Sequence, residues 1–126
     1  MRKLLIVVSL IVLLSILFSG CGIDNPDIAL VKTGHLKMAE DVSIGDAFDK
    51  FFDKPHWEVF NSTDGVKVVE FTGKDADIGV VKVQFKLDGK DGFEVGAMSI
   101  DDKPQNAFSS TGLLKYIFEV YKKSRK

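Results

Sequence analysis

The segment from Ile78 to Leu87 constrains the fold most, because apolar and polar residues alternate along its second half. The alternating positions are Val81, Lys82, Val83, Gln84, Phe85, Lys86 and Leu87. Successive side chains of a strand point to opposite faces of a sheet, so this pattern predicts a strand with one buried and one solvated face. Sheets with such faces are commonly antiparallel.

The neighbouring segments predict a β-meander around this strand. Trp57–Phe60 and Val66–Phe71 flank Asn61–Gly65, which ends in an Asp-Gly pair typical of hairpin turns. Asp88–Gly92 predicts the next turn, and Phe93–Ile100 returns as a strand. Gly96 within that last strand marks an expected bulge or a close approach of another element.

Two other stretches have helical spacing. Ser43 and Asp46 stand three residues apart, as in a capping box, and Lys54-Pro55 should end the helix that they begin. Its apolar face comprises Ile44, Ala47, Phe48, Phe51 and Phe52. The second helix is expected to start at Ser109 or Ser110. Its apolar stripe comprises Leu113, Leu114, Ile117, Phe118 and Tyr121.

Before the first helix, Ile28–Val31 is a short apolar run that we interpret as an edge strand, extended by Leu36 and Met38. The predicted order is then strand, helix, four strands, helix, with Asp101–Pro104 breaking the sheet. Amphipathic helices and an amphipathic sheet bury their apolar faces together when the helices cover one sheet face. The expected fold is therefore a two-layer α+β domain, with an antiparallel sheet of four to five strands and two helices on one face.

The N-terminal segment has the layout of a secretory signal. Arg2 and Lys3 precede Leu4–Phe18, which is apolar except for two serines. This run is shorter than the roughly 20 residues that a membrane-spanning helix needs. It ends at Phe18-Ser19-Gly20-Cys21, which resembles the lipobox of bacterial lipoproteins, with Phe18 where Leu is usual. The resemblance implies cleavage before Cys21 and lipidation of its sulfur, with palmitate as the expected type of chain.

The resemblance divides the chain into a signal peptide at 1–20, a lipidated cysteine with a short linker at 21–27, and one domain at 28–126. It implies a protein of the cell envelope, tethered to a bacterial membrane with its domain on the exported side. An uncleaved anchor would leave the domain in the same compartment. The residue after the cysteine is Gly22. An Asp at this position would resemble an inner-membrane retention signal, so its absence favours the outer membrane in a Gram-negative cell.

The composition narrows the chemistry of the mature chain. Cys21 is the sole cysteine, so its acylation leaves no thiol for a disulfide, a nucleophile or a metal site. Removal of Arg2 and Lys3 leaves 15 basic and 18 acidic residues, a formal charge of −3. This balance lacks the basic footprint of a protein that binds nucleic acid. The basic cluster that follows the last helix (Lys122, Lys123, Arg125 and Lys126) is expected to favour the helix C-terminus, and contact with anionic lipid is the alternative.

No motif predicts a catalytic residue, a cofactor or a metal site. His35 and His56 are the only histidines, and the sequence has no nucleophile elbow, calcium-binding loop or phosphate-binding glycine loop. A Ser-His-Asp triad stays open as an alternative, because its members need only meet in space. The paired aspartates fall in predicted turns, where Asp bonds neighbouring backbone groups: Asp75 with Asp77, Asp88 with Asp91, and Asp101 with Asp102.

The aromatic residues provide the remaining signal for a binding site. Trp57 and Phe60 are three residues apart, so a regular strand places them on opposite faces. One of them would then be exposed as an anchor for a partner, whereas the alternative is a hydrophobic cluster beneath Asn61–Gly65.

We therefore expect a non-catalytic binding or assembly module of the cell envelope. Its partner would be an envelope protein or a glycan. One alternative is a small inhibitor that blocks a hydrolase cleft with Asn61–Gly65 or Asp88–Gly92. Another is a small enzyme or ligand carrier with a pocket between the helices and the sheet.

Overall fold

The computed structural model describes residues 25–125, which form an α+β domain. In chain order its elements are α2 (Pro26–Lys32), α3 (Ile44–Phe51), β1 (Asp53–Asn61), β2 (Lys67–Asp75), β3 (Gly79–Leu87), β4 (Phe93–Ile100), β5 (Lys103–Pro104) and α4 (Ala107–Ser124). All five strands pair with their sequence neighbours in one antiparallel sheet, in the order β1-β2-β3-β4-β5. The predicted meander is confirmed.

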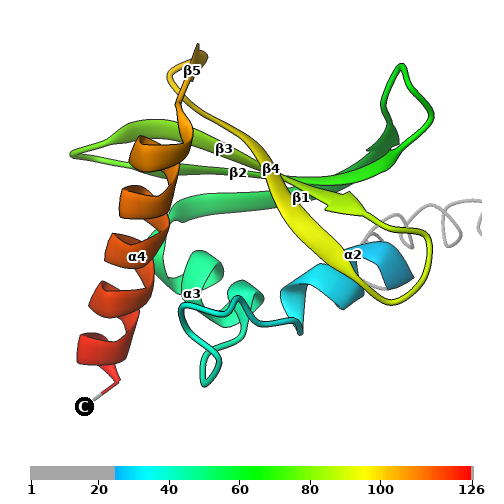
Figure 1. Cartoon of the computed structure of the whole chain (residues 1–126). Helices are drawn as coiled ribbons and strands as arrows, with labels where there is room; N and C mark the ends of the chain where they lie inside the picture. The colour runs from blue at the N-terminus through cyan, green and yellow to red at the C-terminus, as the bar shows by residue number, and fades with distance from the viewer. Residues whose placement is uncertain (1–24, 126) are drawn as a thin grey trace, which may run out of the picture.

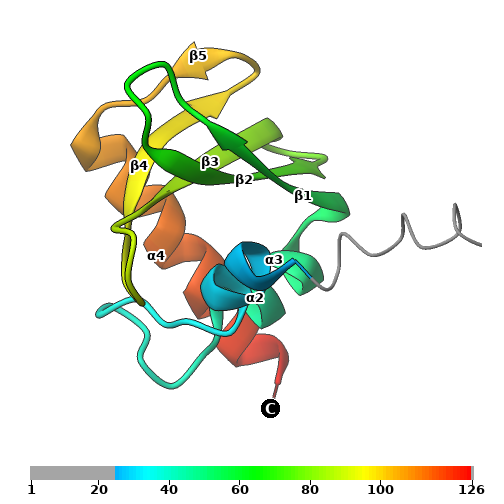
Figure 2. The ribbon, with the colours of Figure 1, turned by 90° about the vertical axis from the view of Figure 1, so that its right-hand side faces the viewer.

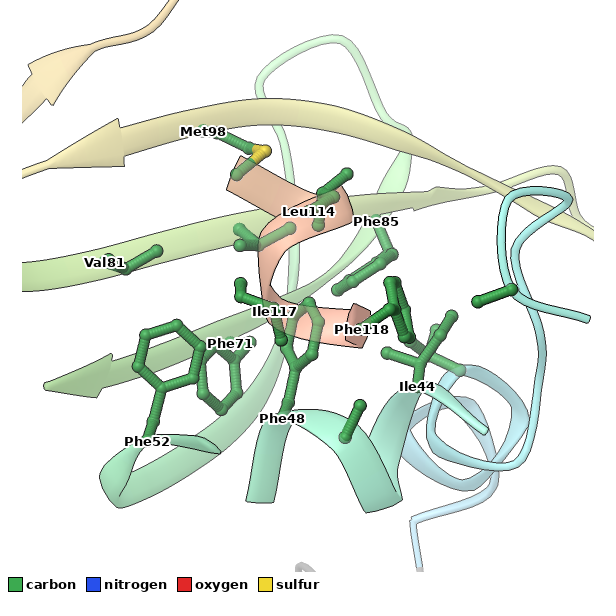
Figure 3. Packing of buried hydrophobic residues seen from close by; sticks show 14 of the residues in the cluster. Ile44, Phe48, Phe52, Phe71, Val81, Phe85, Met98, Leu114, Ile117 and Phe118 are labelled. Atoms are coloured by element: carbon green, nitrogen blue, oxygen red, sulfur yellow. The ribbon is translucent and has the colours of Figure 1, made fainter. Parts of the chain in front are cut away.

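The three helices of this region lie on the same side of the sheet (Figures 1 and 2). The core between them is built from side chains of the helices and of the inward strand positions (Figure 3). Its largest fully buried members include Phe48 on α3, Phe71 on β2, Phe85 on β3, and Ile117 and Phe118 on α4. These aromatic and aliphatic side chains fill the centre of the space between the two layers. A hollow of about 450 Å³ remains at its margin, between α4, β4 and the α2–α3 loop, lined by Leu114, Gly96 and Met38 among others.

The prediction for the first apolar run is wrong, because Ile28–Val31 belongs to helix α2 instead of a strand. The Asn25 side chain accepts hydrogen bonds from the backbone N–H groups of Asp27 and Ile28, and Pro26 occupies the first helical turn. An Asn followed by Pro is a helix start signal. The expected strand extension through Leu36 and Met38 is also absent, since Leu36 makes only an isolated bridge with Ala39.

Helix α3 begins as predicted, with the Ser43 hydroxyl accepting the backbone N–H of Asp46. It ends at Phe51, and β1 starts at Asp53, earlier than the expected strand at Trp57. Lys54 adopts a positive φ of 50° next to a register shift in β1. The chain thus turns from helix to strand before Pro55.

The C-terminal part also departs from the prediction at two points. Asp101 and Asp102 both have positive φ, as the central residues of a two-residue hairpin do, and they lead into β5. The sheet therefore gains a short fifth strand where a break was expected. Helix α4 starts at Ala107, with Asn106 as its N-cap in place of Ser109 or Ser110.

The register of the strands assigns the two sheet faces. Val81, Val83 and Phe85 are fully buried against the helices, as the alternation predicts. The pairing of β3 with β4 shifts between Val83 and Phe85, so two residues of β4, one of them Gly96, stand opposite one of β3. The expected bulge is confirmed.

Candidate functional site

The side chain of Trp57 belongs to the edge of the core. It is half-buried, and its Nε1 donates a hydrogen bond of 2.9 Å to Oδ1 of Asp49 on α3. Its ring lies 4.8 Å from that of Phe71 and stacks on Phe48 at 6.0 Å between centroids. The Lys32 ammonium of α2 lies over the same ring, 5.5 Å from its centroid. Trp57 thus fastens β1 to both N-terminal helices, a role that the sequence pattern does not reveal.

Phe60 lies on the other face of the sheet. It pairs with Val68 of β2, whereas Trp57 pairs with the core residue Phe71, so the two aromatics occupy opposite faces as predicted. The Phe60 side chain is 36% exposed. It lies on the outer face of the sheet, which no helix of residues 25–125 covers. It is therefore the exposed member of the pair.

The outer face around Phe60 is mostly polar. Val68 is 3% exposed but lies outside the core cluster, since Val69 and Phe71 occupy the inward positions. Further along the same face, Gln84 Nε2 donates to Glu70 Oε2 at 2.9 Å between adjacent strands. Phe60 and Val68 thus form a small apolar area within a polar, hydrogen-bonded surface.

The β1–β2 hairpin borders this face. The Ser62 hydroxyl bonds the Asp64 carboxylate, and both side chains bond the Val66 backbone. The Ser62 hydroxyl and the Val66 N–H hold the pKa of Asp64 below its usual range. A hollow of about 490 Å³ lies between this loop and the strands, lined by Val68, Lys86 and Ala97 among others. The loop is thus braced by its own side chains beside a concave part of the outer face.

The two histidines are held in separate local contacts. His35 lies in the α2–α3 loop, with Nδ1 3.0 Å from the Val42 carbonyl oxygen. His56 is on β1, with Nε2 3.6 Å from Glu58 Oε1, and both side chains are exposed. Neither histidine lines the hollow beside the β1–β2 hairpin.

One aspartate of each predicted pair, Asp75, Asp88 or Asp101, bonds backbone N–H groups as predicted. Asp75 Oδ2 accepts two N–H groups at 3.0 Å, and Asp101 Oδ1 accepts that of Val80 at 2.9 Å. Asp88 Oδ1 accepts the N–H groups of Lys90 and Gly92, which lower its pKa. Across residues 25–125, no three His, Cys, Asp or Glu side chains gather as metal ligands would.

The predicted signal peptide, Cys21 and the beginning of the linker lie outside the described residues. Helix α2 starts at Pro26, so residues 26–27 of the predicted linker are helical. Among residues 25–125, none of the helices has the length and apolar character needed to span a membrane.

Comparisons of the chain with family models, curated proteins and solved structures find no match.

Proposed function

We propose that this chain is a lipoprotein of the bacterial cell envelope, and that its domain is a non-catalytic binding or assembly module. The lipobox-type segment ending at Cys21 supports the tether. The observation that carries the binding role is the outer sheet face, which no helix of residues 25–125 covers and which presents Phe60. The core on the opposite face is filled by its own side chains.

The filled core also guides the choice between the alternatives. A ligand carrier needs space between the helices and the sheet, but Phe48 lies 4.9 Å from Phe71 and 6.2 Å from Phe118 there, between ring centroids. These rings occupy the centre of the space where that alternative needs its pocket, and the hollow beside Leu114 and Gly96 lies at the margin. We therefore place recognition on the outside of the sheet and favour a protein or glycan partner over a small molecule.

The lipid anchor at Cys21 is tested by measuring the mass of the protein isolated from membranes. The expected product begins at Cys21 and carries acyl chains, whereas Cys21→Ala should keep residues 1–20. A wild-type protein that retains residues 1–20 without added mass would contradict lipidation.

The binding role is tested by quantitative capture of partners from solubilised membranes. Replacing a central aromatic anchor typically costs about 2 kcal/mol or more, so Phe60→Ser should lower affinity by more than about tenfold. Phe108→Ser is the matched control, because Phe108 is 88% exposed on α4, away from the outer sheet face.

Equal recovery of the partner with wild type and with Phe60→Ser would contradict a binding role for the outer sheet face. A partner that is a hydrolase, inhibited by the domain and lost when residues 88–92 are replaced, would favour the inhibitor alternative.

A further inference from the structure

The distance between the lipid and the folded domain is set by very few residues. Only Gly22, Ile23 and Asp24 separate Cys21 from Asn25, the N-cap of α2. Four extended residues span at most about 14 Å. If Cys21 is acylated, a premise that rests on the proposed function, then Asn25 lies within that distance of the bilayer surface. The start of α2 is thus the point of the domain nearest to the lipid.

Two hairpin turns lie at the same end of the molecule as the start of α2. Figure 1 places the β1–β2 and β3–β4 turns at that end, and Figure 2 views the molecule from it. Asp27 of α2 forms an ion pair of 3.1 Å with Lys67 at the start of β2. Both turns and α2 also line one hollow of about 440 Å³, through Gly65, Lys90 and Leu30 among others. We call Pro26, residues 62–66 and residues 88–92 together the anchor end.

We propose that the anchor end faces the lipid bilayer, with the tips of both hairpins at the headgroups. The exposed tip residues are Thr63, Asp64, Gly65, Gly89, Lys90 and Asp91. The short linker is the reason to expect the bilayer at this end. A domain of this size cannot turn its far end to the membrane on a tether of about 14 Å. The β2–β3 turn, at the opposite end of the sheet in Figure 1, then lies away from the lipid.

The charge of the anchor end indicates what holds it there. It carries Asp64, Asp88 and Asp91 against Lys90, and Asp27 is paired with Lys67. Lys86 of β3 lies beside the first of these turns. Basic clusters attract anionic lipid, but this end has an acidic excess. The acyl anchor therefore holds the domain, and anionic lipid should add no attraction.

The orientation is tested with the full lipidated protein in phosphatidylcholine vesicles, alone or mixed with phosphatidylglycerol. Because the sulfur of Cys21 is acylated, a second cysteine can be labelled selectively with a fluorophore. Thr63→Cys and Lys90→Cys probe the anchor end, and Asp77→Cys in the β2–β3 turn is the matched control. Quenching by a nitroxide on the lipid headgroups reports how near each label lies.

We expect labels at 63 and 90 to be quenched several-fold more than the label at 77, with no increase when phosphatidylglycerol is present. An insertion of about twenty Gly/Ser residues after Ile23 should remove the difference, because such a chain spans about 25 Å on average. Acylated protein that floats with the vesicles but shows equal quenching at all three positions would overturn the orientation alone. Protein without acyl chains would instead contradict the proposed function, and the orientation with it.

Discussion

At the scale of single residues, Phe48 connects the two layers of the domain. It is fully buried, and its ring contacts rings from β1, β2, β3 and α4 at centroid distances of 4.9 to 6.2 Å. Interiors are packed closely enough that neighbours only partly fill the cavity left by a deleted ring. Its position in the sequence predicts a buried helical residue, but its contacts across all these elements come from the tertiary packing.

Phe48→Ala should lower the free energy of unfolding by about 3–5 kcal/mol, through lost burial and the cavity left behind. Urea unfolding followed by the fluorescence of Trp57, the sole tryptophan, measures this change. Phe108→Ala is the control, and we expect it to lie within about 0.5 kcal/mol of wild type because the side chain is 88% exposed. Equal losses in both variants would contradict the role of Phe48.

Asp88 should make part of the stability depend on pH. The backbone N–H groups of Lys90 and Gly92 lower its pKa below the ordinary value of 3.8. A lowered folded-state pKa contributes stability above the ordinary value, and this contribution is lost as pH falls through the folded-state pKa. Asp88→Asn should therefore reduce the loss of stability below about pH 4, as followed by urea unfolding at several pH values. Asp91→Asn, in the same turn, is the control, and an identical pH profile for wild type and Asp88→Asn would contradict this role.

At the scale of elements, helices α2 and α3 show that local sequence signals differ in how well they predict a helix. Helix α3 has both a cap and a regular apolar face, and its start at Ser43 agrees with the prediction, whereas its end at Phe51 comes before the expected Lys54-Pro55. Helix α2 has seven residues, too few to be stable alone, and it depends on docking Ile28 and Val31 into the core. A short apolar run fits a strand or a buried helix equally well by periodicity. The informative signal was the Asn25-Pro26 pair.

Asn25→Ala should lower the free energy of unfolding by about 1 kcal/mol, because it removes the acceptor for two N–H groups of α2. Hydrogen exchange at Asp27 and Ile28 should become faster, while amides of the central strand β3 follow only the global change. Asn25→Ser, which keeps a capping oxygen, should retain most of the stability. Unchanged exchange in Asn25→Ala would contradict the capping role.

At the scale of the whole molecule, one hydrophobic cluster joins all three helices of residues 25–125 to the central strands. Domains of this size with a single core usually unfold in one cooperative step. The sheet also has an exposed outer face opposite that core, so the proposed recognition surface and the stabilising core lie on different sides of the sheet.

Because of this single cluster, Ile117→Ala in α4 should destabilise the sheet and the helices together. The expected loss is about 2–5 kcal/mol for a fully buried isoleucine. Trp57 fluorescence and far-ultraviolet circular dichroism should shift to the same lower urea midpoint. Separate transitions for the two signals would contradict a single cooperative core.

The sequence by itself determined the strands with clear alternation, the first predicted helix and the opposite faces of Trp57 and Phe60. These features depend on residues a few positions apart, whose geometry is fixed by the backbone period. Only the tertiary structure decided that Phe60 is the outward residue, that Ile28–Val31 is helical and that Asp49 binds Trp57. These depend on which sheet face the helices cover, and that choice arises from packing between segments far apart in the chain.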